Sequence, residues 1–343
     1  MLNRSQIYTL LMLRKRGGNI FAALPKDLVP TVGGVYDSAD VEIATLLHYI
    51  AYGNLAEAKK MLDANPRLVL QSAHTETPSG LKVLHTTPLE CALGAGDPEM
   101  AQMIESYFDS EKIEGGAKVR DEQLARYRQH VEDMLNAEKN PPYDFTLLID
   151  TLMAATLEDV TAALNLDFNH ESVLRDVLAQ FRKDFTPGTI TRGMHFNYLH
   201  LLRAFEVYEQ KYDDLYKSGG NDYDKLRLFS RQVIGFIQRS LPAIDRMVFA
   251  QGLYDVVENK AKIERSFKFK YDNADFPVTA GDSSCSGLGY EYYAGARASR
   301  ARTARDGGRR AGCYDSLENL CRAKTSDLQN LCGRSEKRRR LGV

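Results

Sequence analysis

Apolar residues recur at helical spacing over most of the chain. Residues 3–15 predict a short helix, and a stretch rich in Gly and Pro follows it. From about Asp40 to Lys270 the spacing i, i+3, i+4 predicts one helix after another. One of these helices carries an apolar side formed by Leu124, Tyr127, Val131 and Met134. The pattern is typical of a mainly all-α protein.

Residues 170–265 predict a helical extension of four helices. Pro187-Gly188 and Lys217–Gly220 separate the first three of its apolar stripes. The stripes are Val173, Leu174, Val177, Leu178 and Phe181; Phe196, Leu199, Leu202 and Phe205; Leu226, Phe229, Val233, Ile234 and Ile237; and Ile244, Val248, Leu253, Val256 and Val257. Spacing of this kind favours a helical bundle.

The pattern changes after residue 265. Residues 267–271 alternate between aromatic residues and Lys, which predicts a short strand. Ala294–Gly312 contains almost no large apolar residue and is expected to be disordered. A short helix with Leu317, Leu320 and Leu328 is expected after it. Residues 266–343 are therefore predicted to be a short strand followed by an irregular, basic tail.

An internal repeat is the clearest organising signal. Residues 45–51 (Thr-Leu-Leu-His-Tyr-Ile-Ala) align with residues 87–93 (Thr-Pro-Leu-Glu-Cys-Ala-Leu) at an offset of 42. Each copy predicts a helix–turn–helix, with turns at residues 52–54 and 94–97. Neither helix pair can bury its apolar face alone, so the repeat favours a short helical solenoid.

The second copy resembles the ankyrin signature Thr-Pro-Leu-His-x-Ala. It keeps the signature at residues 87–89 and at Ala92, with Glu90 in place of the His. The first copy matches it at Thr45, Leu47, His48 and Ala51. The resemblance implies that His48 is a structural residue, and that Gly96 is the turn glycine, replaced by Asn54 in the first copy.

An ankyrin repeat is about 33 residues long, so this offset leaves about nine extra residues. They fall between Leu68 and Thr86, where ankyrin repeats carry a β-hairpin, and residues 78–80 (Pro-Ser-Gly) predict its turn. We call residues 72–85 the finger. The resemblance implies an extended β-hairpin finger that binds a partner protein. Its expected exposed residues are His74, Thr75, Glu76, Lys82 and His85.

A third, degenerate copy is predicted at residues 146–164, with a plain helical pair as the alternative. The expected organisation has four parts. They are an N-terminal helix and loop (1–35), an ankyrin-like repeat region (36–168), a helical bundle extension (169–265) and the strand with its tail (266–343).

The net charge of the C-terminal tail differs in sign from that of the rest of the chain. The chain of 343 residues has a net charge of −1, whereas residues 283–343 hold eleven Arg and two Lys against six acidic residues. These basic residues are compatible with binding to nucleic acid or anionic lipid, or with nuclear import. No aromatic residue is interleaved with them for base stacking, so a solvated linker is favoured and nucleic-acid binding is not expected.

The sequence shows neither a membrane-spanning segment nor a secretory signal. No apolar run reaches the roughly 20 residues that a membrane helix needs. No secretory signal is predicted, so a cytoplasmic location in the producing cell is expected.

No strong catalytic constellation is found, because phosphate-loop, dinucleotide, zinc-protease and nucleophile-elbow motifs are missing. Neither a cofactor nor a metal is expected. Cys91 is expected to be a core residue. Cys313, Cys321 and Cys332 lack a close cysteine pair, which disfavours zinc; a shared helix face or oxidation in a flexible tail are the alternatives.

Three functions are compatible with these observations. The favoured one is a protein-interaction scaffold. The resemblance extends to ankyrin-repeat effectors that intracellular bacterial pathogens deliver into host cells by type IV secretion, which implies a host protein as partner. The alternative is an enzyme whose active site lies in residues 170–265, with one polar cluster: His195, His200, Asp213 and Asp214. The third is a nucleic-acid or membrane binder that acts through the basic tail.

Overall fold

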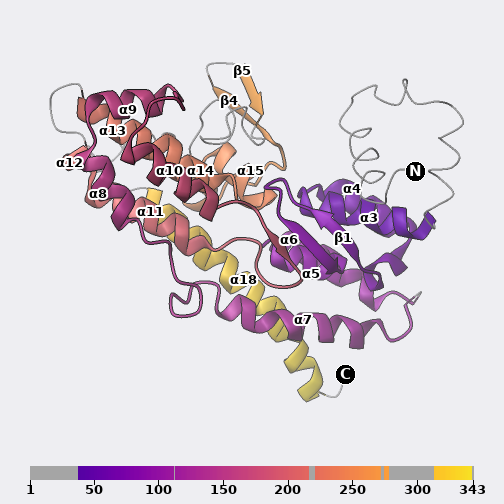
Figure 1. Ribbon diagram of the computed structural model, residues 1–343. Helices are drawn as coiled ribbons and strands as arrows, with labels where there is room; N and C mark the ends of the chain where they lie inside the picture. The colour runs from indigo at the N-terminus through magenta and orange to yellow at the C-terminus, as the bar shows by residue number, and fades with distance from the viewer. Residues whose placement is uncertain (1–37, 112, 216–220, 272–273, 278–312, 342–343) are drawn as a thin grey trace, which may run out of the picture. The chain divides into compact units, whose positions relative to one another are not determined.

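The structure, a computed structural model, describes residues 38–111, 113–215, 221–271, 274–277 and 313–341 (Figure 1). The helix predicted at residues 3–15 and the disorder predicted at 294–312 lie outside these residues. The described residues from 46 onward form one compact unit, and residues 38–45 belong to a separate one. The described chain is mainly helical, as predicted, and contains a small three-stranded sheet.

Two helix–turn–helix pairs begin the described chain. The first pair is α3 (Ser38–Ala51) and α4 (Leu55–Ala64), and the second is α5 (Pro88–Gly94) and α6 (Pro98–Glu105). Short 3-10 turns, Pro66–Leu70 and Ser106–Asp109, follow α4 and α6. Helix–turn–helix elements were therefore predicted in the right places.

The register between the two pairs differs from the prediction by one residue. Gly53 and Gly96 hold the left-handed turn positions, with φ of 68° and 64°. The amide of Gly53 donates to Ile50 O and that of Gly96 to Leu93 O, so the turns correspond at an offset of 43, not 42. The predicted match of Asn54 to Gly96 is wrong, because Asn54 caps α4 through its side chain and corresponds to Asp97, which caps α6.

A β-hairpin lies between the two pairs, within the finger. Strand β1 (Ala73–Glu76) is antiparallel to β2 (Lys82–Thr86), and β2 also pairs in parallel with β3 (Thr189–Ile190). The predicted turn is confirmed: Gly80, at φ 86°, donates its amide to Thr77 O. Because Lys82 N also donates to Gly188 O, residues from the helical extension close one edge of the hairpin.

Helix α7 (Gly116–Glu132) packs on α5 and is the predicted amphipathic helix, with Leu124, Tyr127 and Val131 buried. A capping box between Thr87 and Glu90 begins α5. The same two side chains reach α7, because Thr87 Oγ1 donates to Gln123 and Arg126 Nε donates to Glu90. The Glu that replaces the signature His thus joins two helices.

Residues 146–164 form a helical pair, α8 (Thr146–Ala154) and α9 (Leu157–Leu164). A second capping box, Thr156 with Asp159, begins α9. This pair packs mainly against later helices, α10 (Val173–Asp184) and α13 (Asn221–Leu228), whereas α7 packs on the second pair.

The helical extension is helical at all four predicted apolar stripes, but the third and fourth stripes are each divided among shorter helices. After α10 come α11 (Tyr198–Gln210), α12 (Tyr212–Leu215), α13 with a π-helical segment (Phe229–Ile234), α14 (Gly235–Gln238), α15 (Ala243–Gln251) and α16 (Leu253–Val257). Its core joins the buried apolar faces of α8, α10, α11 and the π-helical segment. There the ring of Phe145 contacts the ring of Phe181 at a tilted angle and the ring of Phe229 edge to face.

The C-terminal part is a correction to the predicted irregular tail. Strands β4 (Lys268–Tyr271) and β5 (Ala274–Pro277) form an antiparallel pair, so the predicted strand is confirmed. From Cys313 to Leu341 the chain is one helix, α18. It packs on α6, α7, α11 and α16 (Figure 1). Its apolar residues make it part of the core: Leu317, Cys321, Leu328 and Leu331 are fully buried.

We expect Leu328→Ala to lower the free energy of unfolding by about 2–5 kcal/mol, because it leaves a cavity under α18. The matched control is Gln329→Ala, an exposed residue on the same helix, which should change it by less than about 0.5 kcal/mol. Urea unfolding of the two variants measures the difference. Equal, small effects would mean that α18 does not belong to the core.

Candidate functional site

Four of the five residues predicted in the finger are exposed. His74, Glu76, Lys82 and His85 reach solvent from β1 and β2. Thr75 does not: its side chain is buried, with 3% of its surface exposed. The expectation for Thr75 is wrong because successive side chains of a strand point to opposite faces. Thr75 pairs with Val83, and both face the buried side.

His74 and His85 form a contact across the hairpin. Their ring centroids lie 4.4 Å apart in an edge-to-face arrangement, and His85 N donates to His74 Nδ1 at 3.1 Å. His85 has a left-handed backbone, φ 52°, which is uncommon outside Gly. Partial burial and the neighbouring His85 lower the pKa of His74. The lowered pKa favours the neutral form of His74, which is exposed on the same hairpin as Glu76 and Lys82.

The polar cluster proposed for an enzyme does not assemble. His195 precedes α11, and its amide donates to Gly94 O. His200, in the first turn of α11, accepts from Tyr143 N. Asp213 and Asp214 lie on α12, which follows the far end of α11, and that end at Gln210 is about 15 Å along the axis from His200. No common point receives the four side chains.

Cysteines and metal ligands offer no site in the described residues. Cys91 is buried as predicted, and burial raises the pKa of its thiol to about 12, which keeps it protonated and unreactive. Cys321 and Cys332 are also buried, on α18. No group of three or more metal-binding side chains occurs among the residues that the structure describes.

One arginine joins both helix–turn–helix turns. Arg265 donates through Nη1 to Gly53 O at 3.0 Å and to Asp97 Oδ2 at 2.7 Å, and through Nη2 to Asp97 Oδ1 and Glu99. The Asp97 carboxylate is almost fully buried, so its bidentate ion pair with Arg265 is partly shielded from water.

A buried triad lies beside the second turn. Lys324 of α18 donates to Asp245 Oδ1 at 2.5 Å and to Tyr198 Oη at 2.8 Å, and Tyr198 Oη donates to Asp245 Oδ2 at 2.6 Å. All three side chains are buried. Burial raises the pKa of Asp245, while Lys324 and Tyr198 act to lower it. A Cβ on Gly96 would meet Tyr198 Oη at 3.1 Å and Lys324 at 3.3 Å, so the turn fits closely against the triad.

A cleft of about 420 Å³ opens at the triad and at Arg265. Its polar lining includes Asp97, Asp245, Arg265 and Lys324. Its apolar walls come from α15, α16 and α18: Ile244, Val248, Val256, Val257 and Leu320. The charged groups at its base are hydrogen-bonded to one another, so their first effect is to hold four distant segments together.

Sequence reasoning missed this cleft because its residues come from segments far apart in the chain. One weak signal was present: Lys324 lies four residues from both Leu320 and Leu328, on the apolar side of its helix. A lysine on such a stripe is buried only when it has a partner.

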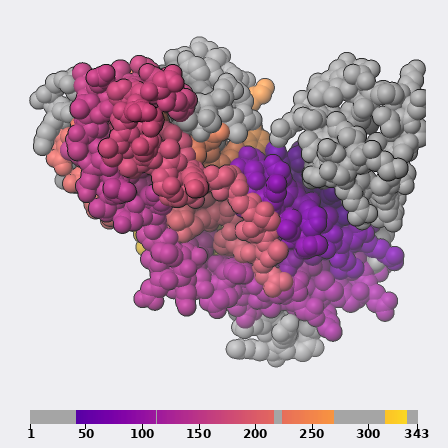
Figure 2. Space-filling view, in the orientation of Figure 1, coloured from indigo at the N-terminus to yellow at the C-terminus, as the bar shows by residue number. Residues whose placement is uncertain are grey.

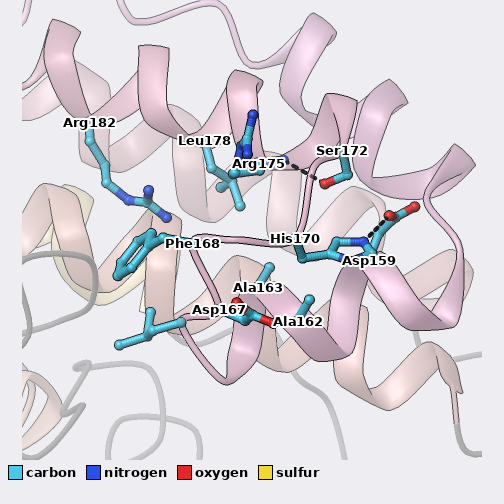
Figure 3. Close-up of a pocket in the computed structure, with 11 residues that line it drawn as sticks. Asp159, Ala162, Ala163, Asp167, Phe168, His170, Ser172, Arg175, Leu178 and Arg182 are labelled. Atoms are coloured by element: carbon cyan, nitrogen blue, oxygen red, sulfur yellow. Dashed lines mark hydrogen bonds and ion pairs between the residues drawn. The ribbon is translucent and has the colours of Figure 1, made fainter.

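A smaller pocket lies between α9 and α10 (Figure 3). His170 and Asp159 are joined at one end by a 2.7 Å contact, and Phe168 and Arg182 lie at the other. Its volume is about 20 Å³, which is room for a water molecule but not for an organic ligand.

Within the described ranges, no helix is both long and apolar enough to cross a bilayer. Comparison of the chain with protein-family models, with curated proteins and with solved structures gave no match.

We expect Lys324→Met to destabilise the protein by about 3–5 kcal/mol, because it leaves the Asp245 carboxylate buried without its cation. The double variant with Asp245→Leu should lose less than the two single variants added together. Arg322→Met is the control, since Arg322 is exposed on the same helix. Urea unfolding gives the values. A Lys324→Met cost as small as that of Arg322→Met would contradict the burial of this pair.

His195 predicts a pH dependence of stability. Both ring nitrogens are buried without a hydrogen-bond partner in the described structure, and burial lowers the pKa of His195 from 6.5 to about 4. Between these values the unfolded chain binds a proton that the folded chain does not. Stability should therefore fall by about 3 kcal/mol as the pH drops from 6.5 to 4.

Unfolding of the wild type and of His195→Gln, measured across this pH range, tests the prediction. The His195→Gln substitution should reduce the dependence of the free energy of unfolding on pH. His170→Gln is the contrasting control: Asp159 raises the pKa of His170, so that histidine adds stability at low pH and loses it as the pH rises. Parallel curves for the wild type and His195→Gln would contradict the prediction.

Proposed function

We propose that the chain is a protein-interaction scaffold that binds a partner protein through the finger. The observation that carries this proposal is the outward face of the hairpin, where His74, Glu76, Lys82 and His85 are exposed together. These side chains offer donors, acceptors and both signs of charge on a backbone fixed by strand pairing. A rigid polar face of this kind suits recognition of a protein surface.

We also propose that the two helix pairs are related to ankyrin repeats. Support comes from Thr87 as helix cap with Pro88 after it, from the left-handed turn glycines, and from a hairpin between the pairs. Helix α7 would close this short stack, through the contacts of Gln123 and Arg126 with α5. The shift to an offset of 43 places Leu47, not His48, at the position of Glu90, so only the second pair carries the signature.

The finger is favoured as the binding end because the turn end is occupied. Gly53 and Gly96 contact α15, Arg265 and Lys324 of the same chain. A partner that approached the turns would have to displace these contacts. By the resemblance to secreted ankyrin-repeat effectors, a host protein is the proposed partner.

Changing the finger should remove partner capture. The variant Glu76→Ala, Lys82→Ala, His85→Asn alters the exposed face and keeps His74, which holds the His85 amide. Asn is chosen because it tolerates a left-handed backbone. The full chain, immobilised, is incubated with eukaryotic cell lysate, and captured proteins are quantified by mass spectrometry. We expect the partner to be reduced at least about tenfold.

The matched control replaces two exposed acids on α7, Glu122→Ala and Glu132→Ala. Circular dichroism confirms that every variant is folded. The proposal fails if the finger variant and the control capture the same proteins in the same amounts.

A further inference from the structure

The helices α8, α9 and the start of α10, at the upper left of Figure 2, carry more than half of the large apolar side chains that are exposed in the described residues. Seven large apolar side chains are exposed in the described residues, and four of them lie between residues 147 and 173. They are Leu147 at 69%, Leu157 at 46%, Phe168 at 58% and Val173 at 71%. We call these four residues and the carboxylates around them the acidic apolar surface. Exposed apolar groups gathered in this way are typical of interaction sites.

The same stretch carries one sign of charge. Residues 140–174 contain no Lys or Arg and hold six acidic residues. They are Asp144, Asp150, Glu158, Asp159, Asp167 and Glu171. Five of the six are exposed, Asp159 being partly buried. The surface is therefore acidic although the chain as a whole is nearly neutral.

Of these six carboxylates, Asp159 alone forms an ion pair among the described residues, and its partner is His170. Arg175 pairs with Asp176, and Arg182 donates to Gln232. Lys225 of α13 donates to Met153 O at the end of α8. Asp150, Glu158 and Glu171 make no ion pair in the described part of the chain.

Apolar and acidic groups alternate across the surface at short range. Leu147 and Asp150 are three residues apart on α8 and therefore share a side of the helix. Glu158 follows Leu157, and Asp167 precedes Phe168. The 2.7 Å contact between His170 and Asp159 holds the loop before α10 against the start of α9 (Figure 3). Apolar anchors thus lie on a fixed backbone and are flanked by carboxylates.

We propose that the acidic apolar surface binds a basic amphipathic helix of a partner protein. An apolar helix face would cover the exposed Leu, Phe and Val side chains, and flanking Lys or Arg would pair with the carboxylates. Leu147 lies in the first turn of α8 and Leu157 is the first residue of α9, so these two anchors come from successive helices. This surface is separate in sequence from the finger, and its proposal does not rest on the finger.

Three other occupants fit less well. An anionic lipid surface or nucleic acid would be repelled by the carboxylates. The chain's own residues 294–312 are basic but carry no large apolar side chain, so they could not cover the apolar anchors.

The test uses the full chain and a fluorescent synthetic helix about 18 residues long, with Leu at i, i+3, i+4 and i+7 and Lys elsewhere. Fluorescence anisotropy gives its affinity. A peptide of the same composition with scrambled order, and one with Glu in place of Lys, should both bind at least about tenfold more weakly. A competing peptide of residues 294–312 should not displace the helix.

Variants locate the binding. Leu157→Ser with Val173→Ser removes anchors, and Glu158→Lys with Glu171→Lys reverses charge; each pair should weaken binding about tenfold. The matched controls are Leu70→Ser and Glu122→Lys with Glu132→Lys, all exposed elsewhere. Equal binding by variants and controls would overturn the proposal. So would equal binding of the scrambled peptide, or displacement by residues 294–312.

Discussion

The buried ion pair between Asp245 and Lys324 is the interaction on which the architecture of residues 46–343 depends. Two charges so deeply buried are tolerable only because each satisfies the other and both bond to Tyr198. The three side chains belong to α11, α15 and α18, and Gly96 fits directly against them. The pair thus fixes where the last helix of the chain lies relative to the second helix–turn–helix.

This constraint decides which surfaces remain available to a partner. Arg265 and the triad cover the turns at Gly53 and Gly96, and residues 187–190 cover one edge of the hairpin. The chain therefore uses its own C-terminal half to bind one end of the helix pairs. The outward face of the finger and the acidic apolar surface on α8–α10 remain exposed, and these are the two regions that we propose contact a partner.

Helices were predictable because their apolar periodicity and caps are local. Thr87 with Glu90 begins α5, and the stripe from Val173 to Phe181 is α10. The register between the two helix–turn–helix pairs was less predictable. The shared Thr at positions 45 and 87 favoured an offset of 42 residues, whereas the backbone geometry of Gly53 and Gly96 gives an offset of 43. The error at Thr75 has a similar cause, since a one-residue change along a strand exchanges its two faces.

The triad and the cleft were beyond sequence reasoning. Asp245 and Lys324 lie far apart in the chain and match no motif, and their proximity arises only when α18 packs on the body. The tail was assigned from its composition, which is dominated by Arg, Gly and Ser before residue 313. The apolar stripe of α18 was therefore not recognised, although Leu317, Leu328 and Leu331 are buried as completely as Leu201 of α11.

Native-state hydrogen exchange across α18 tests the central claim, that this helix is part of the core, most directly. If the triad holds α18 in place, amides of residues 317–332 should exchange only through global unfolding, with the same free energy as those of α11. Exchange of α18 at a much lower free energy, while α11 remains protected, would contradict it.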